Sequence, residues 1–290
     1  MLHINKHFKL TRIAPTPSGY LHLGNAYSFA LTAAIAKRVD ANILLRIDDI
    51  DRDRVEIPYV NDIFDTLKFL DIPWQQGPGN TSQYENEWSQ LCRMDIYQPV
   101  LDKLVQSDKV FACTCSRRLL QTPGYQCSCQ SKKLPLDTAD CAWRISTDQR
   151  TLTINTLEHG AMKYTLPSDM TNFVVRKKDG YPAYQLTSLI DDTHFGVDLI
   201  IRGADLWHST IAQHYLASVL GVISFTESTF HHHELLTTAD DTKLSKSAGA
   251  TSIQYLRKQG LSAEQVYAQI GEAMSPTTQL SNWADLSHNF

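Results

Sequence analysis

The chain has 290 residues, of which 42% are hydrophobic and 20% are charged, and its formal net charge at pH 7 is −4. This composition predicts one large folded domain with an insertion. A net negative charge argues against a protein that coats nucleic acid nonspecifically, and no apolar run approaches the ~18 residues that would span a bilayer. We therefore expect a cytoplasmic protein with no membrane association, and we predict no protein partner.

Strand and helix alternate over the first part of the chain. A strand is expected at 10–14, an Ala-rich helix at 26–38, a strand at 42–47 and a helix at 57–70. This alternation is typical of a parallel sheet with crossover helices, so the expected fold class is α/β.

The later elements continue this pattern around a cysteine-rich insertion. They are expected at 85–106 (helix), 151–154, 173–176 and 199–202 (strands), 208–220 (helix), and 252–258 and 263–273 (short helices). The predicted regions are the first half of the catalytic domain at 8–108, the insertion at 109–172, the second half at 173–247, and a short helical C-terminal region at 248–290.

A turn rich in Pro, Gly and Ser joins the first strand to the first helix. It reads Pro15-Thr16-Pro17-Ser18-Gly19-Tyr20-Leu21-His22-Leu23-Gly24-Asn25. A helix N-terminus offers unpaired N–H groups and the positive end of the helix dipole. Gly19 and Gly24 allow close approach of the backbone, and His22 and Asn25 fall on one helical face. The segment therefore predicts a phosphate-binding site.

A second segment, Lys243-Leu244-Ser245-Lys246-Ser247, places two ammonium groups on a polar loop. Such lysines suit the charge that builds on phosphorus when a carboxylate attacks ATP and pyrophosphate leaves. Each segment taken singly is weak evidence for adenylate chemistry, because short matches of this kind occur often by chance. Their order, their separation and the strand-then-helix context together indicate adenylate chemistry.

The two segments resemble the HIGH and KMSKS signatures of class I aminoacyl-tRNA synthetases. The resemblance implies a Rossmann-like HIGH-type nucleotide-binding fold with Mg-ATP as a substrate. It implies that His22 and Lys246 are catalytic and that Asn25 and Lys243 also bind ATP. Asn25 stands where the signature ends in His, so it can donate a hydrogen bond to phosphate but cannot carry a charge.

Segments 12–19, 45–51, 183–184 and 201–206 narrow the resemblance to glutamyl-tRNA synthetases. The resemblance implies that L-glutamate is held by Arg12, Ile13, Ala14, Pro15, Thr16, Asp48, Tyr184 and Arg202. A guanidinium can fork onto a carboxylate, and an acidic side chain can take the α-ammonium. The family usually has Glu at the position of Asp48, so we expect a longer or water-bridged ammonium contact here.

Plainer interpretations of these residues stay open. The charge run 46–54 is by itself typical of a solvated loop with local ion pairs, and only Asp48 is kept from it as a site residue. Tyr184 can be a core aromatic, and Arg202 can pair with a carboxylate such as Asp205.

Little chain follows the lysine segment, whereas a full glutamyl-tRNA synthetase has a long helical anticodon-binding region there. With its cysteine cluster, the chain resembles the truncated family of glutamyl-Q tRNA(Asp) synthetases. The resemblance implies that glutamyl-adenylate forms without tRNA and that glutamate is transferred to the queuosine base in the anticodon of tRNA(Asp). The alternatives are conventional tRNA glutamylation, a non-catalytic RNA-binding paralogue, and a HIGH-type nucleotidyltransferase that makes a cofactor.

Four of the six cysteines form two C-x-C pairs, Cys113 with Cys115 and Cys127 with Cys129. Such pairs are typical of a tetrahedral zinc site rather than of disulfides, since no signal peptide indicates an oxidising compartment. Spacing alone favours four thiolates. The resemblance instead implies one structural zinc ion held by Cys113, Cys115, Tyr125 and Cys129, with Cys127 as the competing fourth ligand. Unligated thiols are the remaining alternative.

Three consecutive histidines, His231-His232-His233, precede Glu234. Consecutive residues on a strand alternate between its faces, so these three side chains cannot converge on one ion. We expect a strand end near the nucleotide, with at most one histidine facing the site.

Overall fold

The computed structural model describes residues 7–236 and 252–289 of the protein, and it confirms the α/β class. The first elements along the chain are β1 (Leu10–Ile13), α1 (Leu23–Val39), β2 (Asn42–Leu45), α2 (Ile57–Phe69), α3 (Thr81–Gln83), α4 (Met94–Gln106), β3 (Val110–Cys113), α5 (Arg117–Leu120), α6 (Cys129–Lys132) and β4 (Ala142–Ile145). The later ones are β5 (Thr151–Thr156), β6 (Gly160–Thr165), β7 (Val174–Arg176), α7 (Tyr184–Phe195), β8 (Leu199–Gly203), α8 (Trp207–Leu220), α9 (Ile223–Thr226), β9 (Thr229–His233), α10 (Ile253–Lys258) and α11 (Ala263–Met274).

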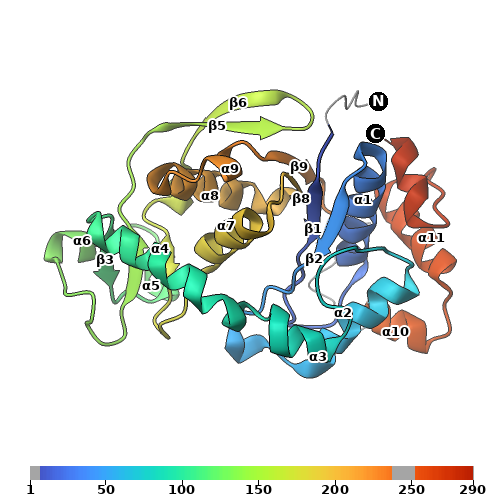
Figure 1. Ribbon diagram of the computed structural model, residues 1–290, viewed down its shortest axis with the longest axis horizontal. Coiled ribbons are helices and arrows are strands. Elements are labelled where there is room, and N and C mark those ends of the chain that lie inside the picture. The colour runs from blue at the N-terminus through green and yellow to red at the C-terminus, as the bar shows by residue number, and fades with distance from the viewer. Residues whose placement is uncertain (1–6, 237–251, 290) are drawn as a thin grey trace.

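The central strands are parallel, as predicted. β1 pairs in parallel with β2, and β8 pairs in parallel with β9. β1 also lies beside β8, where the Asp198 N–H donates a hydrogen bond to the Leu10 carbonyl at 3.1 Å. The two halves of the nucleotide-binding fold therefore meet along β1 and β8, in the middle of the molecule (Figure 1).

Both faces of this central region are covered by helices. Ile43 and Leu45 of β2 join an apolar cluster with α1 and α11, whereas Leu44 between them joins a second cluster with α7 and α8. Figure 1 shows α1 and α11 on one side of β1 and β2, and α7 and α8 on the other. Strands that are buried on both faces carry continuous apolar runs, which explains why the segment reads Ile-Leu-Leu without alternation.

A smaller antiparallel sheet forms the far end of the molecule. Its strand order is β3-β4-β7, and it carries the short helices α5 and α6. Strand pairing does not follow the predicted boundary between the insertion and the second half of the catalytic domain. The β5–β6 hairpin lies within 109–172 but pairs with β9 of the catalytic sheet, while β7 lies within 173–247 but pairs with β4.

The predicted helix at 85–106 is wrong in its first half, because α4 begins only at Met94. The preceding segment forms a π turn and a 3-10 turn. Buried Asp49 accounts for this break. Its carboxylate accepts hydrogen bonds from the Ser89 hydroxyl at 2.5 Å and the Gln90 N–H at 2.7 Å. The chain therefore turns toward Asp49 before it becomes helical.

Helix α7 was not predicted. Buried polar residues interrupt its apolar periodicity, namely Thr187, Ser188, Asp191 and Asp192. Such a pattern does not show helical periodicity, because partners distant in sequence, and not apolar packing, account for Ser188, Asp191 and Asp192. In the described part of the chain, no helix is long and apolar enough to cross a membrane.

Candidate active site

A cavity of about 520 Å³ lies at the carboxyl ends of β1, β2 and β8. In open α/β sheets, ligands bind at this edge of the strands. The lining includes every described residue of the predicted ATP and glutamate sites, namely Arg12, Ile13, Ala14, Pro15, Thr16, His22, Asn25, Asp48, Tyr184 and Arg202. Lys243 and Lys246 lie outside the described residues. The fold thus brings four separate segments to one cavity, while the role of each side chain stays a prediction.

The turn before α1 is closed by two reciprocal hydrogen bonds. The Gly24 N–H donates to His22 Nδ1, and the His22 N–H donates to Asn25 Oδ1, both at 3.1 Å. Because Nδ1 accepts, the ring hydrogen of His22 sits on Nε2. Because Oδ1 accepts, the amide hydrogens of Asn25 remain for other partners. Both side chains can therefore donate to a phosphate at the helix N-terminus.

The packing of this turn leaves little room for a side chain at Gly24. A Cβ atom at this position would lie 3.0 Å from His22 Cε1, so a larger residue would displace the imidazole. The glycine therefore helps to hold the His22 ring against the first turn of α1.

Arg12 and Arg46 share one carboxylate at the floor of the cavity. Arg12 Nε lies 3.2 Å from Asp192 Oδ1, and Arg46 Nη1 lies 2.6 Å from the same atom. Arg12 Nη1 also donates to the Ile201 carbonyl at 2.9 Å, which ties β1 to β8. Buried charges need such partners, so Asp192 fixes the two guanidinium groups relative to each other.

Arg46 also forks onto Asp48. Its Nε donates to Asp48 Oδ1 at 2.7 Å and its Nη2 donates to Oδ2 at 3.0 Å. Burial raises the pKa of Asp48, against the opposing effect of Arg46. Both oxygens of the predicted ammonium ligand therefore already accept hydrogen bonds, and an ammonium group would have to use their remaining lone pairs.

The charge run at 46–54 is only partly a solvated loop. Arg46 is 1% exposed and Asp49 is fully buried, whereas Arg52, Asp53 and Arg54 are exposed. Arg46 lines the cavity but was not predicted as a site residue. The signal was its position between Leu45 and Ile47 at the end of a buried apolar strand.

Arg202 sits at the end of β8 and is 4% exposed. Its Nη2 donates to Thr210 Oγ1 and, at 3.0 Å, to Gln213 Oε1. Nε and Nη1 are buried, with no hydrogen-bond partner among the residues that the structure describes. Burial lowers the pKa of Arg202 to about 10, which still leaves it cationic at neutral pH. An anionic ligand in the cavity would satisfy these donors.

The alternative interpretations of Arg202 and Tyr184 are not supported. No carboxylate lies within ion-pair distance of Arg202 in the described residues, Asp205 included. Tyr184 begins α7 and lines the cavity rather than either apolar cluster.

The three histidines of β9 have three different sets of partners, as predicted. His231 Nδ1 contacts Glu158, and His232 lies between Thr210 and the Gly203 carbonyl. His233 alone of the three lines the cavity, and its Nε2 lies 2.9 Å from the Ser28 hydroxyl. The tract is therefore no single metal site.

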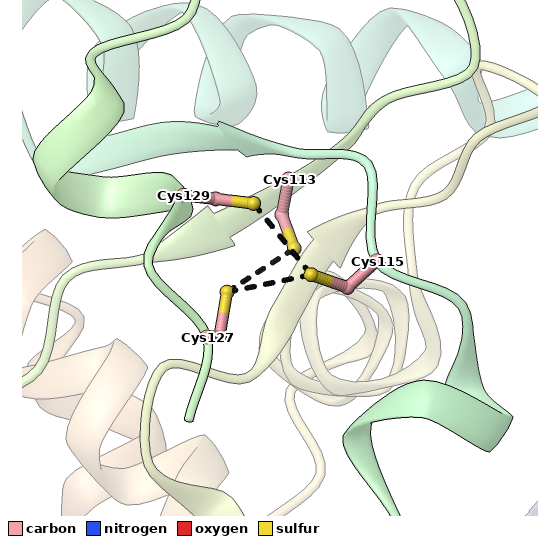
Figure 2. Close-up of side chains that lie close together, drawn as sticks. All are labelled: Cys113, Cys115, Cys127 and Cys129. Carbon is pink, nitrogen blue, oxygen red and sulfur yellow. Dashed lines mark hydrogen bonds between the residues drawn. The ribbon is translucent and has the colours of Figure 1, made fainter. Parts of the chain in front are cut away.

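The four cysteines of the two C-x-C pairs converge at the end of β3 (Figure 2). Cys127 Sγ lies 3.7 Å from both Cys113 Sγ and Cys115 Sγ, and Cys115 Sγ lies 3.6 Å from Cys129 Sγ. Tetrahedral zinc with Zn–S bonds of about 2.3 Å separates its sulfurs by about 3.8 Å. The three distances match this spacing and all four sulfurs lie within 4.8 Å of one another, so the donor set fits one zinc ion.

The fourth position has two candidates. Cys127 completes a set in which all four sulfur atoms lie within 4.8 Å of one another. The Tyr125 hydroxyl lies 3.2 Å from Cys115 Sγ. The sulfur spacing favours Cys127, which sequence analysis placed second, and gives Tyr125 a hydrogen bond to a ligand.

Two neighbouring lysines connect the cysteine cluster to the segment that follows Asp48. Lys178 Nζ donates to the Thr114 carbonyl, between Cys113 and Cys115, at 2.8 Å. Lys177 Nζ donates to the Ile50 carbonyl, two residues after Asp48, at 3.2 Å. The two sites are therefore connected through the end of β7.

Comparison with known proteins agrees with this geometry. The family described as tRNA synthetases class I (E and Q), catalytic domain, matches residues 10–133 and 130–282. A relative named glutamyl-Q tRNA(Asp) synthetase from Methylococcus capsulatus is 33% identical, and the match covers 83% of this chain and 77% of the relative.

Longer relatives match as well. Glutamate–tRNA ligase 2 from Syntrophus aciditrophicus is 29% identical over 87% of this chain, and the chain spans 54% of that relative. The chain spans about half the length of such ligases. A glutamate tRNA ligase from Elizabethkingia meningosepticum has the same fold, with a TM-score of 0.75 at 20% identity over 98% of this chain and 65% of the other. The chain therefore belongs to the class I tRNA synthetases of the E and Q type.

Proposed function

We propose that the protein activates L-glutamate with ATP to give glutamyl-adenylate, without tRNA, and transfers the glutamate to the queuosine base in the anticodon of tRNA(Asp). One observation carries the proposal. A helix N-terminus with the donors that suit a phosphate lines the same cavity as a buried arginine, Arg202, two of whose donors have no hydrogen-bond partner among the described residues. A nucleotide and an acidic amino acid can thus be held side by side.

In the first step, a glutamate carboxylate oxygen attacks the α-phosphorus of Mg-ATP, and the bond to the β-phosphate breaks to release pyrophosphate. His22 Nε2, Asn25 and the predicted Lys243 and Lys246 stabilise the charge on the phosphate oxygens. Arg202 takes the side-chain carboxylate of glutamate, and Asp48 takes the α-ammonium. Arg12, held by Asp192, keeps the floor of the cavity positively charged.

In the second step, a hydroxyl of the queuosine cyclopentene ring attacks the activated carbonyl, and AMP leaves with the bonding electron pair. The relative from Methylococcus capsulatus supports this acceptor, because the match covers most of its length. Conventional glutamylation of a tRNA 3′ end is the second candidate, and the match to glutamate–tRNA ligases supports it.

The cysteine cluster has a structural role in this proposal. Cys113, Cys115, Cys127 and Cys129 would hold zinc through four thiolates, which leaves no open position for a substrate. Zinc would order the loops at the end of β3 and, through Lys178 and Lys177, the segment that follows Asp48.

ATP–pyrophosphate exchange with each amino acid, in the absence of tRNA, tests the first step. We expect exchange with glutamate alone. Lys246→Ala should lower its rate by about 100-fold or more, because it removes a cation from the transition state. Lys258→Ala on α10 is the matched control and should leave the rate unchanged. Exchange that requires tRNA(Glu) would instead favour conventional glutamylation.

Transfer of labelled glutamate tests the acceptor. The substrates are tRNA(Asp) with queuosine, tRNA(Asp) from cells that lack queuosine, and tRNA(Glu). We expect label only on the first, and ribonuclease digestion should recover it in the anticodon fragment. Label at the 3′ end of tRNA(Glu) would overturn the proposed acceptor.

A further inference from the structure

The arginines around the cavity are held in two different ways. Arg12 and Arg46 share the carboxylate of Asp192. Arg202 is equally buried, but the side chains that interact with it directly in the described residues, Thr210, Gln213 and Tyr184, are all neutral. Asp192 acts on this charge from beyond ion-pair distance, and no carboxylate among the described residues pairs with it directly.

The Thr210 contact is part of a short chain of hydrogen bonds. His232 Nδ1 lies 3.1 Å from the Gly203 carbonyl, which can only accept, so Nδ1 carries a hydrogen. Burial and the nearby Arg202 lower the pKa of His232 to about 3, so the ring is neutral and Nε2 accepts. The Thr210 hydroxyl, 2.8 Å away, donates to Nε2 and thereby turns its lone pairs toward Arg202.

Gln213 supplies the second neutral contact. Its Oε1 accepts from Arg202 Nη2 at 3.0 Å, while its Nε2 is buried without a hydrogen-bond partner in the described chain. A carboxylate would fit the same space and would lose no hydrogen bond. The amide at this position therefore leaves the guanidinium charge unpaired where Glu would pair it.

We propose that Gln213 and the Thr210–His232 pair are positioning residues that hold Arg202 through neutral acceptors, so that its charge is reserved for the side-chain carboxylate of the amino acid. The inference rests on the proposed glutamate site. A buried cation without a counterion is costly, and an acidic amino acid removes that cost while an amide amino acid does not. Preference for glutamate over glutamine thus depends on the absence of a protein carboxylate beside Arg202.

Gln213→Glu tests the inference directly. Binding is measured by calorimetry with glutamate and with glutamine, without ATP, so that the result does not depend on catalysis. The Kd for glutamate should rise at least about tenfold, because the new carboxylate takes the charge of Arg202. The preference over glutamine should shrink, and the Tm of the ligand-free protein should rise. A merely structural role of Gln213 would lower the Tm instead.

Gln254→Glu is the charge-matched control, since Gln254 lies on α10 and does not line the cavity. It should leave the Kd for glutamate and the preference unchanged. Thr210→Val tests the other anchor by removing the hydroxyl that accepts from Arg202. It should also weaken glutamate binding about tenfold. Its matched control is Thr193→Val, because the hydroxyl oxygens of both threonines lie near the carbonyl four residues earlier in their helix, at 2.8 Å for Thr193 and 3.3 Å for Thr210.

The outcomes separate the two proposals. If the wild type binds glutamate and Gln213→Glu binds it equally well, the neutral-anchor inference is overturned while the proposed function stands. If the wild type binds glutamine as tightly as glutamate, the inference also falls. If the wild type neither binds glutamate nor supports exchange with it, both are overturned.

Discussion

The cavity region and the cysteine-containing end of the molecule are ordered by different means. Around the cavity, buried charges are tied together across elements, as where Asp191 accepts from Arg93 at 2.8 Å and from the Tyr97 hydroxyl at 2.5 Å. At the other end, α5 and α6 have only four residues each, and four thiols converge between them and β3.

The difference shows that buried carboxylates and thiolates are stabilised by different partners, namely cations and hydroxyls in one case and a metal ion in the other. A buried carboxylate is costly unless cations and hydroxyls surround it, so the ion pairs of the cavity region select one arrangement of helices around the sheet. A short loop with little apolar surface cannot order itself, but thiolates around one metal ion can hold it. The first region should therefore respond to loss of a charge, and the second to loss of a metal.

Loss of the metal should have the largest effect. We expect about one zinc ion per chain. Cys127→Ser should weaken zinc binding by more than about 100-fold, because loss of a residue that only hydrogen-bonds to a ligand already weakens metal binding by up to about that factor. Limited proteolysis should then cut near α5 and α6 while the central sheet stays intact. Cys141→Ser is the control, since Cys141 lies outside the cluster.

Tyr125→Phe decides the fourth ligand in the same experiment. With Cys127 as the ligand, this variant keeps its zinc and loses only the hydrogen bond to Cys115. Zinc lost from Tyr125→Phe and kept by Cys127→Ser would instead establish the phenolate set.

Asp191→Ala should have the next largest effect, on global stability. Asp191 is 0% exposed, and its loss leaves Arg93 buried without an anion, so the free energy of unfolding should fall by about 3–5 kcal/mol. Urea denaturation of the zinc-loaded protein measures this. Asp148→Ala removes a comparable fork to Arg150 at the surface and should change little, because that pair is solvent-exposed. Equal losses would contradict the proposed importance of burial.

A pH series gives the smallest expected effect. Burial beside Phe225 and Phe230 lowers the pKa of His214 from 6.5 to about 3. The unfolded chain therefore binds a proton below pH 6.5 that the folded chain does not, and stability falls as pH falls. Between pH 7 and pH 5 this residue should contribute a loss of about 2 kcal/mol, which His214→Gln removes. His159→Gln, at an exposed position, is the control, and an equal change in both variants would contradict this assignment.

The sequence by itself determined the parallel strands, the glycine-containing turn before α1 and the cysteine cluster. These features depend on neighbours in the chain. The apolar run at 42–47, the glycine beside His22 and the paired cysteines each carry their signal within a few residues. The residues that the family resemblance assigned to the ATP and glutamate sites line one cavity wherever the structure describes them.

Only the tertiary structure decided which charges are buried and what they contact. Arg46 reads as part of a solvated charge run, yet it lies between Asp48 and Asp192, and the latter is 146 residues away. Helix α7 was missed because Asp191 and Asp192 look unsuited to a buried helix until Arg93, Arg12 and Arg46 are placed beside them. Partners distant in sequence determine the free energy of a buried polar group, so local patterns cannot reveal it.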